Sequence, residues 1–181
     1  MQTQVAGRYF WIPISIANYI TAVKRKKVAI VELLQVNLLE DLAHYFNQNI
    51  GDGEYFELFG VRYYPYYKEK LLTKLLKENF NYIIFDGLRL FGNRSADMSD
   101  YHKKILVGSL KIWEAGEYKE CLDGLLEKDD RGEYYLLAEY FERKEVRQAE
   151  KKLGKSIVKI PPELNPFRIR RTEFDFFETF L

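Results

Sequence analysis

The chain has 181 residues, enough for one α/β domain with a hydrophobic core. Its 28 basic and 27 acidic residues give a formal net charge of +1, which provides no reason to expect a nucleic-acid partner. The single cysteine, Cys121, excludes an internal disulfide bond and is typical of a reducing compartment. We therefore expect a cytoplasmic protein, and the first residues do not have the pattern of a signal peptide.

Two further classes are disfavoured by the residues themselves. The two histidines, His44 and His102, lie far apart with no ligand spacing around them, so we expect no metal site. No apolar run reaches the ~18–20 residues that a membrane-spanning helix needs, so we expect no stable membrane insertion.

Apolar periodicity at the start of the chain predicts a helix followed by a buried strand. A short first strand over residues 3–6 precedes a helix over 12–24, with Pro13 in its first turn, where a missing N–H is harmless. The continuous apolar run 28–34 is typical of a central parallel strand covered on both faces. Asn37 could then cap a helix over 38–47.

The next segment predicts a short hairpin insertion at residues 54–64, with Phe59-Gly60 in its turn. A helix over 67–78 follows, and a buried strand over 81–86 ends in Asp86. We expect the inward face of that helix to carry four leucines: Leu71, Leu72, Leu75 and Leu76.

The second half continues the alternation of strands and helices. We expect a loop over 87–102, strands over 105–110, 133–140 and 156–160, and helices over 112–127, 142–153 (ending at Gly154) and 172–181. This alternation predicts an α/β protein: a single three-layer α/β/α domain over residues 1–181, with a mostly parallel sheet and right-handed crossovers.

The last helix invites comparison with a membrane-targeting tail. Its acidic residues would be repelled by anionic lipid, so we expect its apolar residues to dock onto the domain instead. The acidic residues are Glu173, Asp175 and Glu178, and the docking residues are Phe174, Phe177 and Leu181.

Tyrosines cluster in one short stretch of the chain, at Tyr63, Tyr64, Tyr66 and Tyr67. They favour either a contact surface or amphipathic tyrosines at strand edges and turns. We do not expect all of these rings to be buried.

Five segments, taken in order, carry a resemblance to a known family: residues 16–20, 26–32, 82–86, 105–113 and 144–162. The first is similar to the helix after the phosphate loop, and the second to the second strand with its acidic end. The third is similar to the Walker B strand. The fourth is similar to the strand that leads to a helix with an early tryptophan, and the fifth to the closing helix, strand and proline turn. In this order they resemble the MinD/ParA-like branch of the P-loop NTPases over nearly the whole chain. The resemblance implies a P-loop NTPase-like fold.

The departures from that family cluster where nucleotide would bind. A phosphate loop needs glycines for close backbone approach, a lysine on the β- and γ-phosphates and a hydroxyl on Mg²⁺. Residues 8–11, Arg-Tyr-Phe-Trp, stand where those groups belong. We therefore expect a degenerate Walker A segment whose aromatic rings fill the phosphate cradle.

Two other family positions also differ. Glu32 is followed by two leucines, where this branch has a second aspartate near the attacking water. Glu139 or a neighbour stands where an asparagine reads the adenine edge, and a carboxylate can only accept hydrogen bonds.

Three residues remain as a relic nucleotide site: Arg8, Glu32 and Asp86. Arg8 could hold a phosphate with two hydrogen bonds. Asp86 would either hold Mg²⁺ through water or cap the end of its strand. Glu32 is either a relic acid or a cap for the turn before Leu38.

The main hypothesis is a non-catalytic protein of P-loop NTPase fold that acts through a protein partner or a homodimer, without a cofactor. The resemblance implies regulatory or scaffolding roles in bacterial-type positioning, secretion or pilus machinery. One alternative is a deviant ATPase that binds ATP and Mg²⁺. Another is a different doubly wound domain with a ligand near Glu32, Asp86 and Ser109, at the carboxyl ends of the strands.

Overall fold

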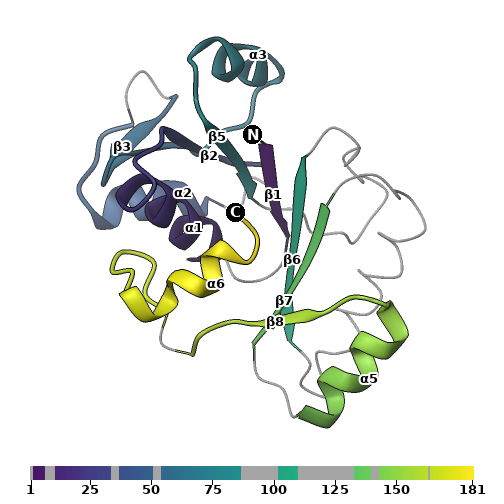
Figure 1. Cartoon of the computed structure of the whole chain (residues 1–181). Coiled ribbons are helices and arrows are strands. Elements are labelled where there is room, and N and C mark those ends of the chain that lie inside the picture. Colours follow the sequence, from purple (N-terminus) through teal and green to yellow (C-terminus); the bar gives the residue numbers. More distant parts are fainter. Residues whose placement is uncertain are drawn as a thin grey trace.

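The computed structural model describes residues 2–6, 11–33, 37–50, 54–86, 102–109, 133–139, 143–162 and 164–181. Its strands form one sheet in the order β3-β4-β2-β5-β1-β6-β7-β8 (Figure 1). All neighbouring pairs are parallel except β3 with β4. The structure thus confirms the α/β class and the mostly parallel sheet.

The elements of the first half follow the predicted order. They are β1 (Gln2–Ala6), α1 (Trp11–Ala22), β2 (Val28–Glu32), α2 (Leu38–Tyr45), β3 (Phe56–Leu58), β4 (Val61–Tyr64), α3 (Glu69–Lys77) and β5 (Tyr82–Asp86). The second half contains β6 (Lys103–Ser109), β7 (Glu133–Glu139), α5 (Arg143–Leu153), β8 (Ile157–Lys159), the 3₁₀ turn η2 (Arg171–Glu173) and α6 (Phe174–Glu178). Residues 87–101 of the loop predicted over 87–102, and the helix predicted over 112–127, lie outside the described residues.

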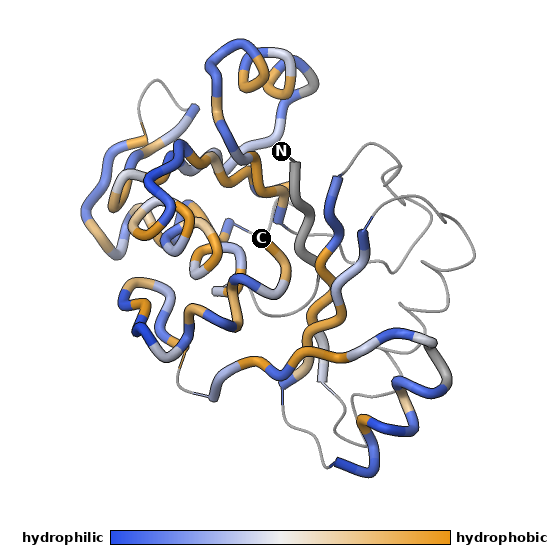
Figure 2. Tube along the Cα trace, viewed as in Figure 1, coloured by the Kyte–Doolittle hydropathy of each residue, from blue (hydrophilic) through white to orange (hydrophobic). Residues whose placement is uncertain are grey.

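Helices cover both faces of the sheet. Alternate residues of β2 divide between two apolar clusters: Val28 and Ile30 pack with α1, α2 and α6, whereas Ala29 and Val31 pack with α3. The five residues of β2 are all buried, as a continuous apolar run in a central parallel strand requires. Figure 2 shows hydrophobic colour concentrated in the central strands and in α1.

The predicted hairpin is part of the main sheet. Its turn residues, Phe59 and Gly60, have φ values of 52° and 78°, so both occupy the left-handed region that a tight hairpin turn uses. One of its strands, β4, then pairs in parallel with β2, from Val28–Val61 to Val31–Tyr64. The segment therefore forms the edge of the sheet, with β3 as its antiparallel border.

The prediction for the inward face of α3 is wrong at one position. Leu71 and Leu75 are buried and Leu72 is half-buried, but 59% of Leu76 is exposed. Leu71 and Leu75 are four residues apart and form one stripe, whereas Leu76 is turned about 100° from Leu75. A stripe this narrow contacts the sheet along one line only.

The C-terminal segment packs into the core as expected. Phe177 is fully buried, and Phe174 and Leu181 are partly buried against the same apolar cluster. In Figure 1 this segment, drawn in yellow, lies beside α1. α5 ends as predicted, because Gly154 has a φ of 63° and its N–H donates to the carbonyl of Glu150.

Candidate functional site at the carboxyl edge of the sheet

The carboxyl edge of the parallel sheet is the place where folds of this class bind ligands. β1 lies between β5 and β6, and the chain leaves it to enter α1. β2 and β5 lie on one side of β1, whereas β6 and β7 lie on the other. The side on which successive strands join the sheet therefore switches at β1. The end of β1 and the start of α1 therefore mark the candidate site.

Two buried carboxylates stand side by side at this edge. Glu32 ends β2, Asp86 ends β5, and the two residues are register partners in the parallel pair. They share the face that α1 covers, because Ile30 and Ile84, two residues before each of them, pack in the α1 cluster. Both side chains are buried, Glu32 at 2% and Asp86 at 7% exposure. The structure thus brings together two of the three residues expected in the relic site.

Glu32 binds the start of α2. Its Oε2 accepts a hydrogen bond from the N–H of Leu39 at 3.0 Å, and its Oε1 accepts one from the N–H of Leu38 at 3.3 Å. These amides belong to the first turn of the helix, which has no carbonyl partners for them within the helix. Of the two interpretations left open by the sequence, the structure therefore supports the cap.

Asn37 does not cap α2 as predicted. Its φ is 60°, in the left-handed region, and its side chain makes no capping hydrogen bond. A capping side chain requires an extended backbone at that position, which Asn37 lacks. The carboxylate of Glu32 takes over this role from the adjacent strand.

The first turn of α1 is apolar and enclosed. Ile12 and Ile14 are at most 1% exposed, and Pro13 between them has no N–H to offer a ligand. The first hydroxyl of the helix, on Ser15, donates a hydrogen bond to the carbonyl of Trp11 at 2.8 Å. The described part of this helix start therefore offers neither a lysine nor an uncommitted hydroxyl. Arg8 lies outside the described residues.

Ser109 lies farther out along the same edge. The pairings of β1 place Val5 level with both Asp86 and Ile105. Ser109 is four residues beyond that level, or about 13 Å at the rise of a parallel strand. Its register partner is Glu139 on β7. The structure therefore does not place Ser109 with Glu32 and Asp86.

The predicted tyrosine surface is wrong for two of its four members. Tyr63 and Tyr64 are fully buried, because both faces of β4 are covered: Tyr63 packs in the α1 cluster and Tyr64 in the α3 cluster. Burial raises the pKa of the Tyr63 hydroxyl. Tyr66 is half-buried and 40% of Tyr67 is exposed, so only these two could belong to a contact surface.

An exposed aromatic cluster lies elsewhere and was not predicted. It consists of Tyr45, Phe46, Phe59 and Phe167, with the ring of Phe46 5.0–5.9 Å from each of the other three. Tyr45 is 80% and Phe59 58% exposed. The position of Phe59 at the tip of a hairpin turn was a usable signal, but the cluster joins three segments that are distant in sequence.

Within the described ranges, no group of three or more histidine, cysteine or acidic residues could hold a metal ion. In the same part of the chain, no helix combines the length and apolar character needed to cross a bilayer.

Solved structures with a similar fold were found for nearly the whole chain. MinD cell division protein from Aquifex aeolicus has a TM-score of 0.59 and 14% identity, covering 97% of this chain and 85% of that one. A ParA family ATPase from Chlorobium tepidum has a TM-score of 0.58 and 15% identity, covering 90% and 84%. A plasmid partition protein from Borrelia burgdorferi has a TM-score of 0.60 and 10% identity, covering 98% and 93%. The chain has a MinD/ParA-like fold.

No protein-family description and no curated protein sequence matches the chain. At 10–15% identity the three structural similarities concern the fold alone. The prediction of a MinD/ParA-like fold is thus confirmed, and function must be argued from the residues at the site.

Proposed function

We propose that this protein is a non-catalytic member of the P-loop NTPase fold that acts through protein contacts. The observation that carries this proposal is the start of α1. Phosphate binding in this fold relies on a lysine and a hydroxyl at that helix start, together with free backbone amides. Here Trp11, Ile12 and Pro13 occupy the first turn, and Ser15 bonds to the carbonyl of Trp11.

The use of Glu32 supports the same proposal. Both of its carboxylate oxygens accept hydrogen bonds from the first turn of α2. A carboxylate held in this way serves the stability of a helix, and each of its oxygens already has one acceptor site occupied by a backbone amide. The residues before Trp11, Arg-Tyr-Phe, also lack the glycines of a phosphate cradle.

A contact role is supported by the exposed aromatic cluster. Large aromatic side chains gathered on a surface are typical of protein interfaces, where they supply most of the binding free energy. Among the similar structures, one is a MinC:MinD complex from Aquifex aeolicus with a TM-score of 0.53, so a protein of this fold is found bound to another protein. We propose the same mode of action for this chain, with a partner protein or a second copy.

Thermal unfolding with and without ATP and Mg²⁺ tests the non-catalytic part. A ligand at a hundred times its dissociation constant would add about 2.7 kcal/mol, or roughly 5–10 °C in Tm for a domain of this size. We expect no rise at millimolar nucleotide. A rise in the wild-type protein that disappears in Asp86→Ala and in Arg8→Ala would favour the alternative, a deviant ATPase.

Pull-down from a lysate of the native host tests the contact part. We expect a captured protein to be lost when Tyr45 and Phe59 are replaced by serine. Leu76→Ser is the matched control, because Leu76 lies away from the cluster on α3 and is 59% exposed, close to the 58% of Phe59. Equal capture by both variants would show that the aromatic cluster is not the contact surface.

A further inference from the structure

Helix α5 separates its charges between two sides. Its exposed residues are Arg143, Lys144, Arg147, Gln148 and Lys151, and none of these is acidic. The acidic residues of α5, Glu145 and Glu150, are both half-buried. Glu150 accepts a hydrogen bond from the N–H of Ile157 at 2.9 Å. The solvent side of α5 is therefore positively charged, although the whole chain carries a formal charge of only +1.

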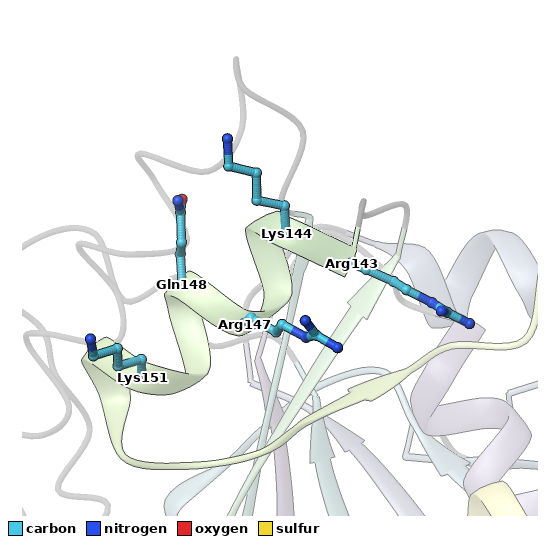
Figure 3. Close-up of a pocket in the computed structure, with 5 residues that line it drawn as sticks. All are labelled: Arg143, Lys144, Arg147, Gln148 and Lys151. Atoms are coloured by element: carbon cyan, nitrogen blue, oxygen red, sulfur yellow. The ribbon is translucent and has the colours of Figure 1, made fainter.

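The five exposed side chains, which we call the α5 basic face, line one shallow hollow. At 100° per residue they fall within an arc of ~140°, along ~12 Å of helix. Figure 3 shows Lys144 and Gln148 extending on one side of the helix, and Arg143 and Arg147 extending together on another. Figure 2 shows the helix mostly in hydrophilic colour, so this surface does not cover a second apolar core.

The cations of this face have no carboxylate partners in the described part of the chain. Elsewhere on the surface, Lys24, Arg62 and Lys74 each contact a glutamate. Salt bridges within α5 could have neutralised its cations at little cost, since i,i+4 pairs form readily on helices. Instead four cations lie at about one-turn spacings without a salt bridge to a carboxylate of the described residues, and an anionic ligand would relieve their mutual repulsion.

We propose that the α5 basic face binds an acidic segment of a partner protein. Two observations argue against other polyanions, and a third suits carboxylates. The near-zero charge of the chain gives little long-range attraction to a nucleic acid, whose binding depends on many phosphate contacts. Among the described residues, no apolar side chain lines the hollow to enter a bilayer. The guanidinium groups of Arg143 and Arg147 match carboxylates in geometry as well as charge.

The spacing of the cations defines the partner further. Arg143, Arg147 and Lys151 repeat every four residues, so their Cα atoms are ~6 Å apart along the helix axis. Acidic residues repeating every four positions on a partner helix have the same spacing. The partner segment is thus a helix with glutamate or aspartate at i, i+4 and i+8. This inference rests on the proposed function and names the chemistry of one of its partners.

Fluorescence anisotropy with a labelled synthetic helix carrying glutamates at every fourth position tests the inference. The full-length protein should bind this peptide at low salt, more weakly at 0.15 M salt, where the Debye length is about 8 Å. A peptide with the same glutamates replaced by glutamine should not bind. Circular dichroism and the thermal midpoint verify that each variant is folded.

The variant that tests the site is Arg143→Glu, Arg147→Glu, Lys151→Glu, and glutamate is itself a good helix former. The matched control is Arg25→Glu, Lys26→Glu, Lys27→Glu, which changes the net charge equally at three exposed cations before β2. We expect the α5 variant to weaken peptide binding by about tenfold or more and the control to change it little.

Three outcomes would overturn the inference: no peptide binding by the wild-type protein at low salt, an equal loss in both variants, or tighter binding of duplex DNA or of anionic vesicles that the α5 variant abolishes. Nucleotide binding in the thermal assay would reject the proposed function without changing the peptide result. The two failures are therefore distinguishable.

Discussion

The hydroxyl of Tyr19 in α1 donates a hydrogen bond to Oε1 of Glu178 in α6, 159 residues later in the chain. The other oxygen of Glu178 accepts a hydrogen bond from Lys24 at 2.8 Å, and the ring of Tyr19 stacks on Phe177 at 4.6 Å. One residue earlier, Asn18 donates to the carbonyl of Pro166 at 2.7 Å. The helix that follows β1 is therefore held from outside by the C-terminal segment.

The Tyr19–Glu178 hydrogen bond makes the stability of the fold depend on pH in the alkaline range. Burial, followed by the bond to Glu178, raises the pKa of Tyr19 from 10 to about 12. This contribution is complete below the unfolded pKa of 10 and is lost as pH rises toward 12. We expect Tyr19→Phe to lower stability at neutral pH by about 1 kcal/mol and to lose less stability than the wild type above pH 10. Urea unfolding across this pH range measures both, and parallel pH curves would contradict the assignment.

Phe177 links the C-terminal segment to the core. It is fully buried and contacts the rings of Tyr19, Phe176 and Phe180. We expect Phe177→Ala to destabilise the protein by about 3–5 kcal/mol, because truncation leaves a cavity in a packed cluster. Tyr45→Ala, at a site 80% exposed, should change stability by less than about 0.5 kcal/mol. Chemical denaturation compares the two, and similar effects would mean that α6 is not packed in the core.

Glu32 should contribute to stability as a helix cap. Glu32→Gln retains the size of the side chain but replaces one carboxylate oxygen, so we expect a loss of about 1–2 kcal/mol. Asn37→Gly should be nearly neutral, because glycine accepts the left-handed backbone and the asparagine side chain makes no capping bond. Hydrogen exchange of the Leu38 and Leu39 amides locates the effect. Unchanged exchange in Glu32→Gln would rule out the capping role.

Substituting two glycines that have similar φ angles, Gly60 and Gly154, distinguishes the cost of backbone strain from the cost of a steric contact. A Cβ on Gly60 would lie 3.1 Å from Cγ2 of Thr21, whereas a Cβ on Gly154 would have no atom within 4 Å. Gly154→Ala should therefore cost only the left-handed backbone strain, about 1–2 kcal/mol. Gly60→Ala should cost more, because the hairpin turn must also move away from α1. If urea unfolding showed the same loss of stability for both substitutions, the hairpin turn would be free to move away from α1.

Local patterns were sufficient to predict most elements. The apolar run after residue 27 could only be a strand covered on both faces, and Gly154 ended α5 because glycine tolerates a positive φ. The side-by-side placement of Glu32 and Asp86 could also be expected, since the carboxyl ends of neighbouring parallel strands meet at one edge. The errors arose where the partner of a residue is distant in sequence.

Tyr63 and Tyr64 illustrate the limit. Their sequence suits an exposed edge strand, but β3 on one side, and α1 and α3 on the two faces, bury both rings. Likewise, the sequence left two roles open for Glu32, and only the folded chain shows its carboxylate at the start of α2. The aromatic cluster at Phe46, Phe59 and Phe167 joins three separate segments, so only folding reveals it.

The sequence by itself determined the α/β class, the order of the elements and the residues at the start of α1, because these depend on periodicity, backbone preference and residue identity. Only the tertiary structure decided which carboxylate caps α2, which aromatic rings stay exposed, and that the cations of α5 stand apart from any carboxylate in the described part of the chain. Those features depend on distances between separate secondary-structure elements, and such distances are defined only once the elements have packed together.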